Sequence, residues 1–526
     1  MIGLEDLKQR LSQAFKDCDQ GCSAFITRGL EKESLRVTPN GYLAQTSHPL
    51  ALGSALTNPY ITTDYSEALL EFVTPPLQDA QKLMSFLKHT HQFTLKNLKQ
   101  EMLWPLSMPC LIKSADEIPI ARYGSSNVGQ MKHIYRKGLD YRYGKKMQCI
   151  SGVHYNFSLS KMFWKHYQSQ LNDQQSLRDF IDESYFKIIR NFDRYAWLII
   201  YLFGSSPVVC KSFLADQKVS SDLKSLDANT FYKPFGTSLR MSDIGYKSDV
   251  QKKLNVSYNN LNDYVAGLIK AMTTVYPAYE KHGIKHGGEY MQLNTNYIQV
   301  ENEYYGLIRP KRVTLEGERP TQALKRRGVE YIELRCLDVN PFSPVGVTIE
   351  QLYFIDVFIL FCLMTDAPMI EDKEREQISS NHRLTVNQGR KDNLQLYKVI
   401  DGEPTTLKKW AKELFERLEL VAEFMDINLA KPVYQKNMSL FKTMVEDPNE
   451  TYSGQILRLL KQNKQSFFDL ALELTHKHDQ TLKRHEFSSK VLGRFEQTAI
   501  DSIDDQREIE ASDKLTLDEY LKKFFG

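Results

Sequence analysis

The segment Gly152–Leu159 alternates polar and apolar side chains over its whole length. Successive side chains of a β-strand point to opposite sides, so this period of two predicts a strand with one polar and one apolar face. The polar face carries His154, Asn156 and Ser158. A strand that only builds a core needs no such polar row, so this face is a candidate for function.

The segment Leu30–Val37 has a second polar face, where Glu31 and Glu33 lie together if the segment is a strand. In Glu67–Thr74, Glu71 shares a face with Glu67, and Asp64 lies just upstream. A single Glu-x-Glu pair is more often the solvent-facing side of a strand than a site.

Two later segments follow the same pattern less regularly. In Val329–Asp338, Glu333 and Arg335 share a face with Tyr331, an arrangement that alone fits a surface ion pair. We also expect a strand over residues 291–300, although its alternation is blurred. The short basic run at residues 309–312 is interpreted as a solvated loop or strand end.

Five segments each have a polar face. Their occurrence in one chain favours a shared metal site over five independent solvent-facing surfaces. If they converge, four or five carboxylates and one imidazole would share a cavity, and their mutual repulsion would be costly without cations. Hard oxygen ligands with one imidazole suit Mg²⁺ or Mn²⁺. Spacing alone leaves open whether the faces converge.

Helical periods flank these strands and dominate after Pro344. We expect helices over residues 4–20, 78–102, 176–204, 260–275, 350–365, 406–425, 451–477 and 515–525, and a loop over residues 104–130. Strands segregated from helices predict an α+β fold with a mixed antiparallel sheet. We treat residues 1–526 as a single catalytic unit, with a sheet-based catalytic core over residues 22–345 and a mainly helical C-terminal part over residues 346–526.

The composition of the chain argues against nucleic-acid and membrane partners. The 68 Lys and Arg residues nearly balance the 65 Asp and Glu residues, so a nucleic-acid partner is not expected. No secretion signal is present and no apolar run is long enough to span a bilayer, so we expect a cytoplasmic protein without a membrane partner. The seven scattered cysteines fit a reducing compartment. The GxxxxGK[ST] and GxGxxG patterns are both missing, so a bound nucleotide would have its phosphates held through metal.

Several long motifs resemble the bacterial glutamate–cysteine ligase family (γ-glutamylcysteine synthetase, type 1). They lie at residues 28–37, 48–57, 61–72, 104–110, 150–157, 237–246, 308–312, 328–335 and 338–344. The resemblance implies a glutamine-synthetase-like fold, in which a curved, mainly antiparallel sheet forms an active-site funnel. It also implies ATP-dependent joining of L-glutamate to L-cysteine through γ-glutamyl phosphate, the first step of glutathione biosynthesis.

The resemblance assigns roles residue by residue. It implies magnesium ligands, for which Mn²⁺ could substitute, at Glu31, Glu33, Asp64, Glu71, His154 and Glu333. It places the catalytic Arg335 beside the transferred phosphoryl group. It implies that groups of glutamate or of the intermediate are held by Gln148, Asn156 and Arg240. It implies that the cysteine site is bordered by Tyr65, Tyr135, Tyr246 and Tyr305. It further suggests a monomer that glutathione inhibits by feedback.

Two alternatives remain. A related ATP-dependent carboxylate–amine ligase with another acceptor would keep the metal residues and change the tyrosine wall, where Tyr65 replaces a frequent Phe. A catalytically inactive homologue that acts as a binding subunit would have lost a metal ligand or Arg335. All of these residues are retained.

Overall fold

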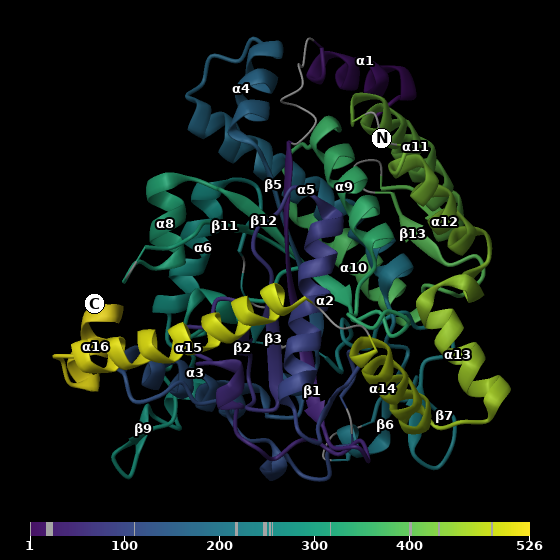
Figure 1. Cartoon of the computed structure of the whole chain (residues 1–526). Helices are drawn as coiled ribbons and strands as arrows, with labels where there is room; N and C mark the ends of the chain where they lie inside the picture. Colours follow the sequence, from purple (N-terminus) through teal and green to yellow (C-terminus); the bar gives the residue numbers. More distant parts are fainter. Residues whose placement is uncertain are drawn as a thin grey trace.

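The structure is a computed structural model, built around one antiparallel sheet (Figure 1). It describes residues 2–16, 25–109, 111–215, 219–245, 250–251, 254, 256–315, 317–398, 402–429, 432–484 and 488–526. The sheet has the order β11-β12-β5-β1-β3-β2, and β4 pairs with the end of β1. Its strands are β1 (Ile26–Val37), β2 (Ile61–Thr63), β3 (Leu69–Val73), β4 (Met102–Leu103), β5 (Gly152–Leu159), β11 (Ile308–Lys311) and β12 (Tyr331–Asp338). The α+β class with a mainly antiparallel sheet is confirmed.

Strand β1 lies between β5 and β3, and its register fixes which polar residues become neighbours. Glu31 pairs with His154 of β5, whereas Glu33 pairs with Glu71 of β3. Two positions along β5, Asn156 pairs with Glu333 of β12. Since residues paired across a ladder point to the same face, the polar faces of four strands join into one surface.

The opposite face of the sheet packs on buried helices. The helices α5 (Leu177–Phe203) and α9 (Ile349–Met364) pack on each other, and α5 also contacts β12. Helix α9 is buried around most of its circumference, as its almost uniformly apolar sequence requires. It begins at Thr348, whose hydroxyl accepts a hydrogen bond from the backbone N–H of Gln351 in a capping box. The larger core cluster therefore lies on one side of the sheet. The other side carries the polar residues, and next to them Leu35, Val37 and Leu69 pack into a second, smaller cluster.

The remaining elements surround this core. The helices are α1 (Leu4–Ala14), α2 (Ala80–Asn97), α3 (Asn127–Tyr143), α4 (Lys161–Gln170), α6 (Leu261–Thr273), α7 (Pro277–Glu280), α8 (Pro320–Arg327), α10 (Asp372–Gln388), α11 (Leu407–Leu429), α12 (Tyr434–Glu446), α13 (Tyr452–Asn463), α14 (Phe467–Lys483), α15 (Ser489–Ser512) and α16 (Leu517–Phe525). Small sheets pair β6 (Val208–Cys210) and β7 (Lys224–Ser225) with β8 (Thr230–Tyr232), β9 (Lys285–His286) with β10 (Glu289–Tyr290), and β13 (Gln395–Tyr397) with β14 (Pro404–Thr406). Among the described residues, no helix is both long and apolar enough to cross a membrane.

Two sequence expectations need correction. Residues 291–300 form no strand, because side-chain amides take the place of a ladder: Gln299 Oε1 accepts from the Leu293 N–H at 2.9 Å, and Asn294 Nδ2 donates to the Gln299 carbonyl at 2.9 Å. The single helix expected over residues 451–477 is two helices, because Lys464 adopts a left-handed conformation (φ 52°) that ends α13.

A buried ion pair connects β1 to the helical layer. Arg28 Nη2 lies 2.6 Å from Asp356 Oδ2 of α9, and both side chains are almost fully buried. The Tyr155 hydroxyl of β5 donates to the other Asp356 oxygen at 2.5 Å, and Arg28 Nη2 also lies 3.0 Å from the Tyr434 hydroxyl of α12. One carboxylate thus holds two central strands and two helices in place.

We predict that Asp356→Ala strongly destabilises the fold, because it leaves the Arg28 guanidinium buried without its counter-charge. Removing one partner of a buried pair costs about 3–5 kcal/mol, which urea denaturation followed by circular dichroism would detect. Asp366→Ala is the control, since its pair with Arg10 is largely exposed and contributes about 1 kcal/mol or less. Equal midpoints for the two variants would contradict a structural role for the buried pair.

Candidate active site

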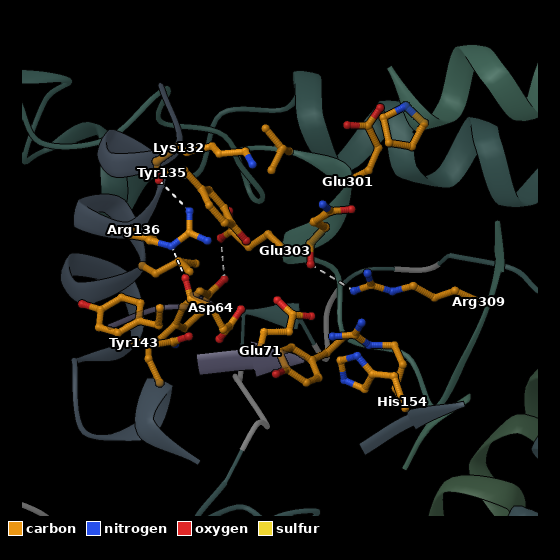
Figure 2. Close-up of a pocket in the computed structure, with 18 of the residues that line it drawn as sticks. Asp64, Glu71, Lys132, Tyr135, Arg136, Tyr143, His154, Glu301, Glu303 and Arg309 are labelled. Carbon is orange, nitrogen blue, oxygen red and sulfur yellow. Dashed lines mark hydrogen bonds between the residues drawn. The ribbon is translucent and has the colours of Figure 1, made fainter. Parts of the chain in front are cut away.

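A cavity of about 380 Å³ lies over the polar face of the sheet. Its walls come from β1, β3, β5, β11, β12, helix α3 and the 3₁₀ segment around residue 301. Figure 2 shows Asp64 and Glu71 pointing into this space, with Lys132 and Arg136 of α3 on one side and His154 and Arg309 on the other. Acidic and basic groups therefore face each other across one cavity.

The six acidic and imidazole residues expected as metal ligands all line this cavity: Glu31, Glu33, Asp64, Glu71, His154 and Glu333. Three of the carboxylates lie around His154. Its Nδ1 is 3.3 Å from Glu31 Oε2 and 3.8 Å from Glu333 Oε1, and its Nε2 is 3.8 Å from Glu33 Oε1. The convergence that spacing left open is therefore present.

Glu31, His154 and Glu333 bring three potential ligand atoms within 4.8 Å of one another. Two carboxylate oxygens and one imidazole nitrogen are a donor set that suits Mg²⁺ or Mn²⁺. Glu33 is oriented by the backbone N–H of Gly152, which donates to its Oε2 at 2.6 Å. Asn156 Nδ2 donates to Glu31 Oε1 at 2.8 Å. Each of these two glutamates is thus held in place through one carboxylate oxygen, which leaves the other oxygen to face the neighbouring ligands.

The pKa values of these buried carboxylates shift in opposite directions. Burial and the nearby Asp64 raise the pKa of Glu33 to about 8, and burial with the charge of Glu31 raises the pKa of Glu71 well above its usual range. Burial also acts on Glu333, but Lys311 and Arg335 outweigh it and hold the pKa of Glu333 well below its usual range. The β1–β3 side of the cavity therefore has uncompensated acidity, as expected of a cation site.

Two basic side chains lie close to the Glu333 carboxylate. Arg335 Nη1 lies 3.2 Å and Lys311 Nζ 3.5 Å from Glu333 Oε1. Lys311 and Arg309 belong to β11 and line the cavity, so part of the basic run interpreted as a solvated loop or strand end is a strand that faces the site. The period-two spacing of Arg309 and Lys311 beside a proline was the only sequence signal of this placement.

Helix α3 contributes residues that sequence reasoning missed. Lys132 and Arg136 lie one turn apart, both line the cavity, and both rest on the ring of Tyr123. Burial lowers the pKa of Lys132 to about 8. Arg136 Nε donates to the backbone carbonyl of Asp64, which fixes the loop that presents this carboxylate. The four-residue spacing of two basic side chains was the available signal.

The expected substrate residues divide into three groups. Tyr65, Tyr135, Gln148 and Tyr305 line the cavity. Arg240 lies behind β12 and does not line it: its Nη2 donates to the Arg335 carbonyl at 2.9 Å, and its Nη1 is 3.7 Å from Asp338. Asn156 acts through Glu31 as described above, and Tyr246 lies outside the described residues.

Two further carboxylates of the cavity wall are already paired. Glu303 accepts from Arg142 at 2.9 Å and from the Tyr143 hydroxyl at 2.8 Å. Glu301 accepts from the Thr321 hydroxyl at 2.7 Å and lies 3.3 Å from Arg319. Because arginine neutralises each of them, they contrast with Glu33 and Glu71 and fit a structural role.

Comparisons with known proteins point to one family. The family model described as Glutamate-cysteine ligase matches residues 13–385. A glutamate–cysteine ligase of Alcanivorax borkumensis is 45% identical over 527 residues, covering 99% of this chain and 100% of the relative. One of Pseudomonas putida is 46% identical and covers 92% of each chain. A crystal structure of the Francisella tularensis glutamate–cysteine ligase in complex with AMP is 38% identical, with a TM-score of 0.90 over 95% of this chain and 98% of that chain.

We predict that Glu33→Gln separates metal binding from folding. Without metal, the variant should be as stable as the parent or more stable, because it removes a buried acid next to Asp64 and Glu71. With Mg²⁺ at about 100 times the dissociation constant, binding to the native state adds about 2.7 kcal/mol, and the variant should lose most of this gain.

Thermal melts with and without MgCl₂ measure both effects. Glu330→Gln is the control, because Glu330 is an exposed acid that precedes β12 outside the cavity and pairs with Arg312. An equal Mg²⁺-dependent gain in Glu33→Gln and the parent would remove Glu33 from the metal site.

Proposed function

The chain belongs to the glutamate–cysteine ligase family, and we propose that it forms γ-glutamylcysteine from L-glutamate and L-cysteine with hydrolysis of ATP. The observation that carries this proposal is the meeting of six potential metal ligands and Arg335 in one cavity. The AMP bound to the Francisella tularensis relative supports a nucleotide as co-substrate.

The reaction needs an activated acyl group. A carboxylate is a poor acyl donor because its oxide is a bad leaving group, whereas an acyl phosphate is a good one. Transfer of the ATP γ-phosphoryl group to the glutamate γ-carboxylate gives γ-glutamyl phosphate and ADP. The neutral amine of cysteine then attacks the acyl carbon, phosphate leaves, and the attacking nitrogen loses a proton.

The cavity fits magnesium on the chemistry of its donors. Glu31, His154 and Glu333 would hold one ion, and Glu33, Asp64 and Glu71 would share the others, since Glu33 and Glu71 are buried beside other carboxylates and a cation would offset their repulsion. ATP and glutamate are both anionic and repel each other. When bound, Mg²⁺ would supply positive charge beside the phosphate oxygens and reduce this repulsion. Mn²⁺ would substitute because it accepts the same ligands.

Arg335 is the proposed catalytic cation. It lies beside Glu333 at the cavity wall, where a planar guanidinium can donate to two oxygens of a transferring phosphoryl group. Lys311 and Arg309 extend the positive charge along β11 and would bind the remaining phosphates. This placement supplies donors where charge develops, which is a large contribution to catalysis in such reactions.

Tyr65, Tyr135 and Tyr305 would form the acceptor wall, with Gln148 on the glutamate side. Tyr65 is 1% exposed, and its hydroxyl has no hydrogen-bond partner among the described residues. A buried hydroxyl without a partner costs free energy, so it favours an acceptor that offers a polar atom there. Arg240 supports the site by holding the Arg335 backbone.

The remaining family expectations are proposals of the same kind. A cytoplasmic location fits the bacterial relatives and the cysteines that the structure describes, Cys149, Cys210, Cys336 and Cys362, which are buried and free. A monomer and feedback inhibition by glutathione follow from the family resemblance. Glutathione contains the γ-glutamylcysteine unit that this cavity would produce, which is a chemical reason for it to compete there.

The proposed reaction predicts that ADP release requires glutamate, cysteine and MgCl₂ together. A coupled ADP assay with each component omitted in turn is the measurement, and mass spectrometry should identify γ-glutamylcysteine. ADP release with another amine but not with cysteine would establish the alternative ligase with a different acceptor. No release with any amine would favour an inactive homologue.

We further predict that Arg335→Lys lowers kcat by about 10²–10³, because a single ammonium cannot reproduce the paired donation of the guanidinium. KM for ATP should change much less, since the lost interaction belongs to the transition state. Arg507→Lys, an exposed change on α15, is the control. A kcat within about twofold of the parent would exclude the catalytic role of Arg335.

A further inference from the structure

The helix α16 forms part of the substrate cavity wall although it lies far along the chain from the sheet. Phe524 of α16 lines the same cavity as Glu31 and Arg335. Figure 1 shows α15 crossing the face of the molecule in yellow and leading into α16 beside α3. The family model ends at residue 385, so this contact lies outside the region that it matches.

The apolar face of α16 packs on the cavity-forming helix. Leu521 is buried in a cluster with Ile134 of α3, and Leu517 and Phe525 lie against the same cluster. Tyr135, which lines the cavity, belongs to this cluster as well. The spacing of residues 517, 521, 524 and 525 gives one apolar stripe, while Lys522 and Lys523 are exposed on the other side. Helix α16 thus supports the side of α3 that carries an expected acceptor residue.

Polar contacts fix the position of α16 from two directions. The backbone N–H of Asn127, the first residue of α3, donates to Asp513 Oδ2 at 2.5 Å, and Asn127 Nδ2 donates to the Leu515 carbonyl at 2.8 Å. Within α16, Asp518 accepts from Lys285 Nζ at 2.8 Å and from the Tyr290 hydroxyl at 2.5 Å. The N-terminal side of α16 is therefore fixed by polar contacts to α3 and to the β9–β10 pair, in addition to the apolar contact with α3.

Arg319 connects the end of α16 to the opposite cavity wall. Its guanidinium lies 5.8 Å from the ring centre of Phe524 and 5.9 Å from that of Phe525. On its other side it pairs with Glu301, which also lines the cavity. The Phe524–Arg319–Glu301 series thus joins α16 to the rim formed by the 3₁₀ segment, and Phe524 is held by a cation–π contact.

We propose that α16 is a positioning element of the active site: Phe524 forms one wall of the substrate cavity, and the docking of α16 on α3 sets the position of the acceptor-binding Tyr135. This inference rests on the proposed function, because it assigns the Tyr135 side to the amino-acid acceptor. Loss of the contact leaves the metal ligands and Arg335 in place on the sheet, so it changes acceptor binding and not the chemical step.

Point variants of the full chain test this role. Phe524→Ala should raise KM for cysteine by about tenfold, since small displacements of a positioning group produce changes of this size or larger. KM for ATP and kcat at saturating cysteine should stay within about twofold. Phe524→Leu should restore most of the affinity because it refills the wall, and Lys523→Ala on the exposed face should match the parent.

A second variant tests whether the docking of α16, and not only the Phe524 side chain, affects KM for cysteine. Leu521→Ala loosens the α16–α3 contact without changing the cavity lining, and it should raise KM for cysteine while hydrogen exchange speeds up at residues 517–525. Faster exchange at these residues with an unchanged KM for cysteine in both variants would overturn the proposal. An equal rise in KM for ATP and cysteine would also overturn it. Inactivity of the parent with glutamate and cysteine would instead refute the proposed function itself.

Discussion

The register of β1 against its two neighbours is the constraint on which the site depends. Glu31 meets His154 on one side, and Glu33 meets Glu71 on the other, because β1 pairs with β5 and β3 at once. A shift of one residue in either ladder would turn the two glutamates toward the helical core. The buried pair between Arg28 and Asp356 opposes such a shift, since it fixes the start of β1 against α9.

The buried carboxylates of the cavity fall into two sets, one paired with arginine and one close to other carboxylates. The carboxylates of Glu301 and Glu303 are compensated by arginine, as buried acids usually are. Those of Glu33 and Glu71 are buried together, and their raised pKa values reflect the missing counter-charge. A fold under selection for stability alone would remove this repulsion. Divalent cations bound there, as proposed above, would offset this repulsion.

The helical part after residue 345 is more than a support for the sheet. Through Asp356 it holds β1 and β5, and through α16 it reaches the cavity wall. Segments separated by several hundred residues therefore build one cavity. In this arrangement most carboxylates of the cavity belong to the sheet, whereas the wall that carries Tyr135 is formed by α3, on which α16 packs.

The sequence by itself determined the strands β1, β5 and β12 and the faces of their acidic residues, because a period of two is a local property of the chain. Its long motifs identified the family and implied the ligand set that is proposed here. Only the tertiary structure decided that these faces converge, because convergence depends on register between distant strands. It also placed Lys132, Arg136, Lys311 and Phe524 in the cavity wall and moved Arg240 behind it. Those placements depend on how α3, β11 and α16 pack, and packing between distant segments leaves no periodic signal in the sequence.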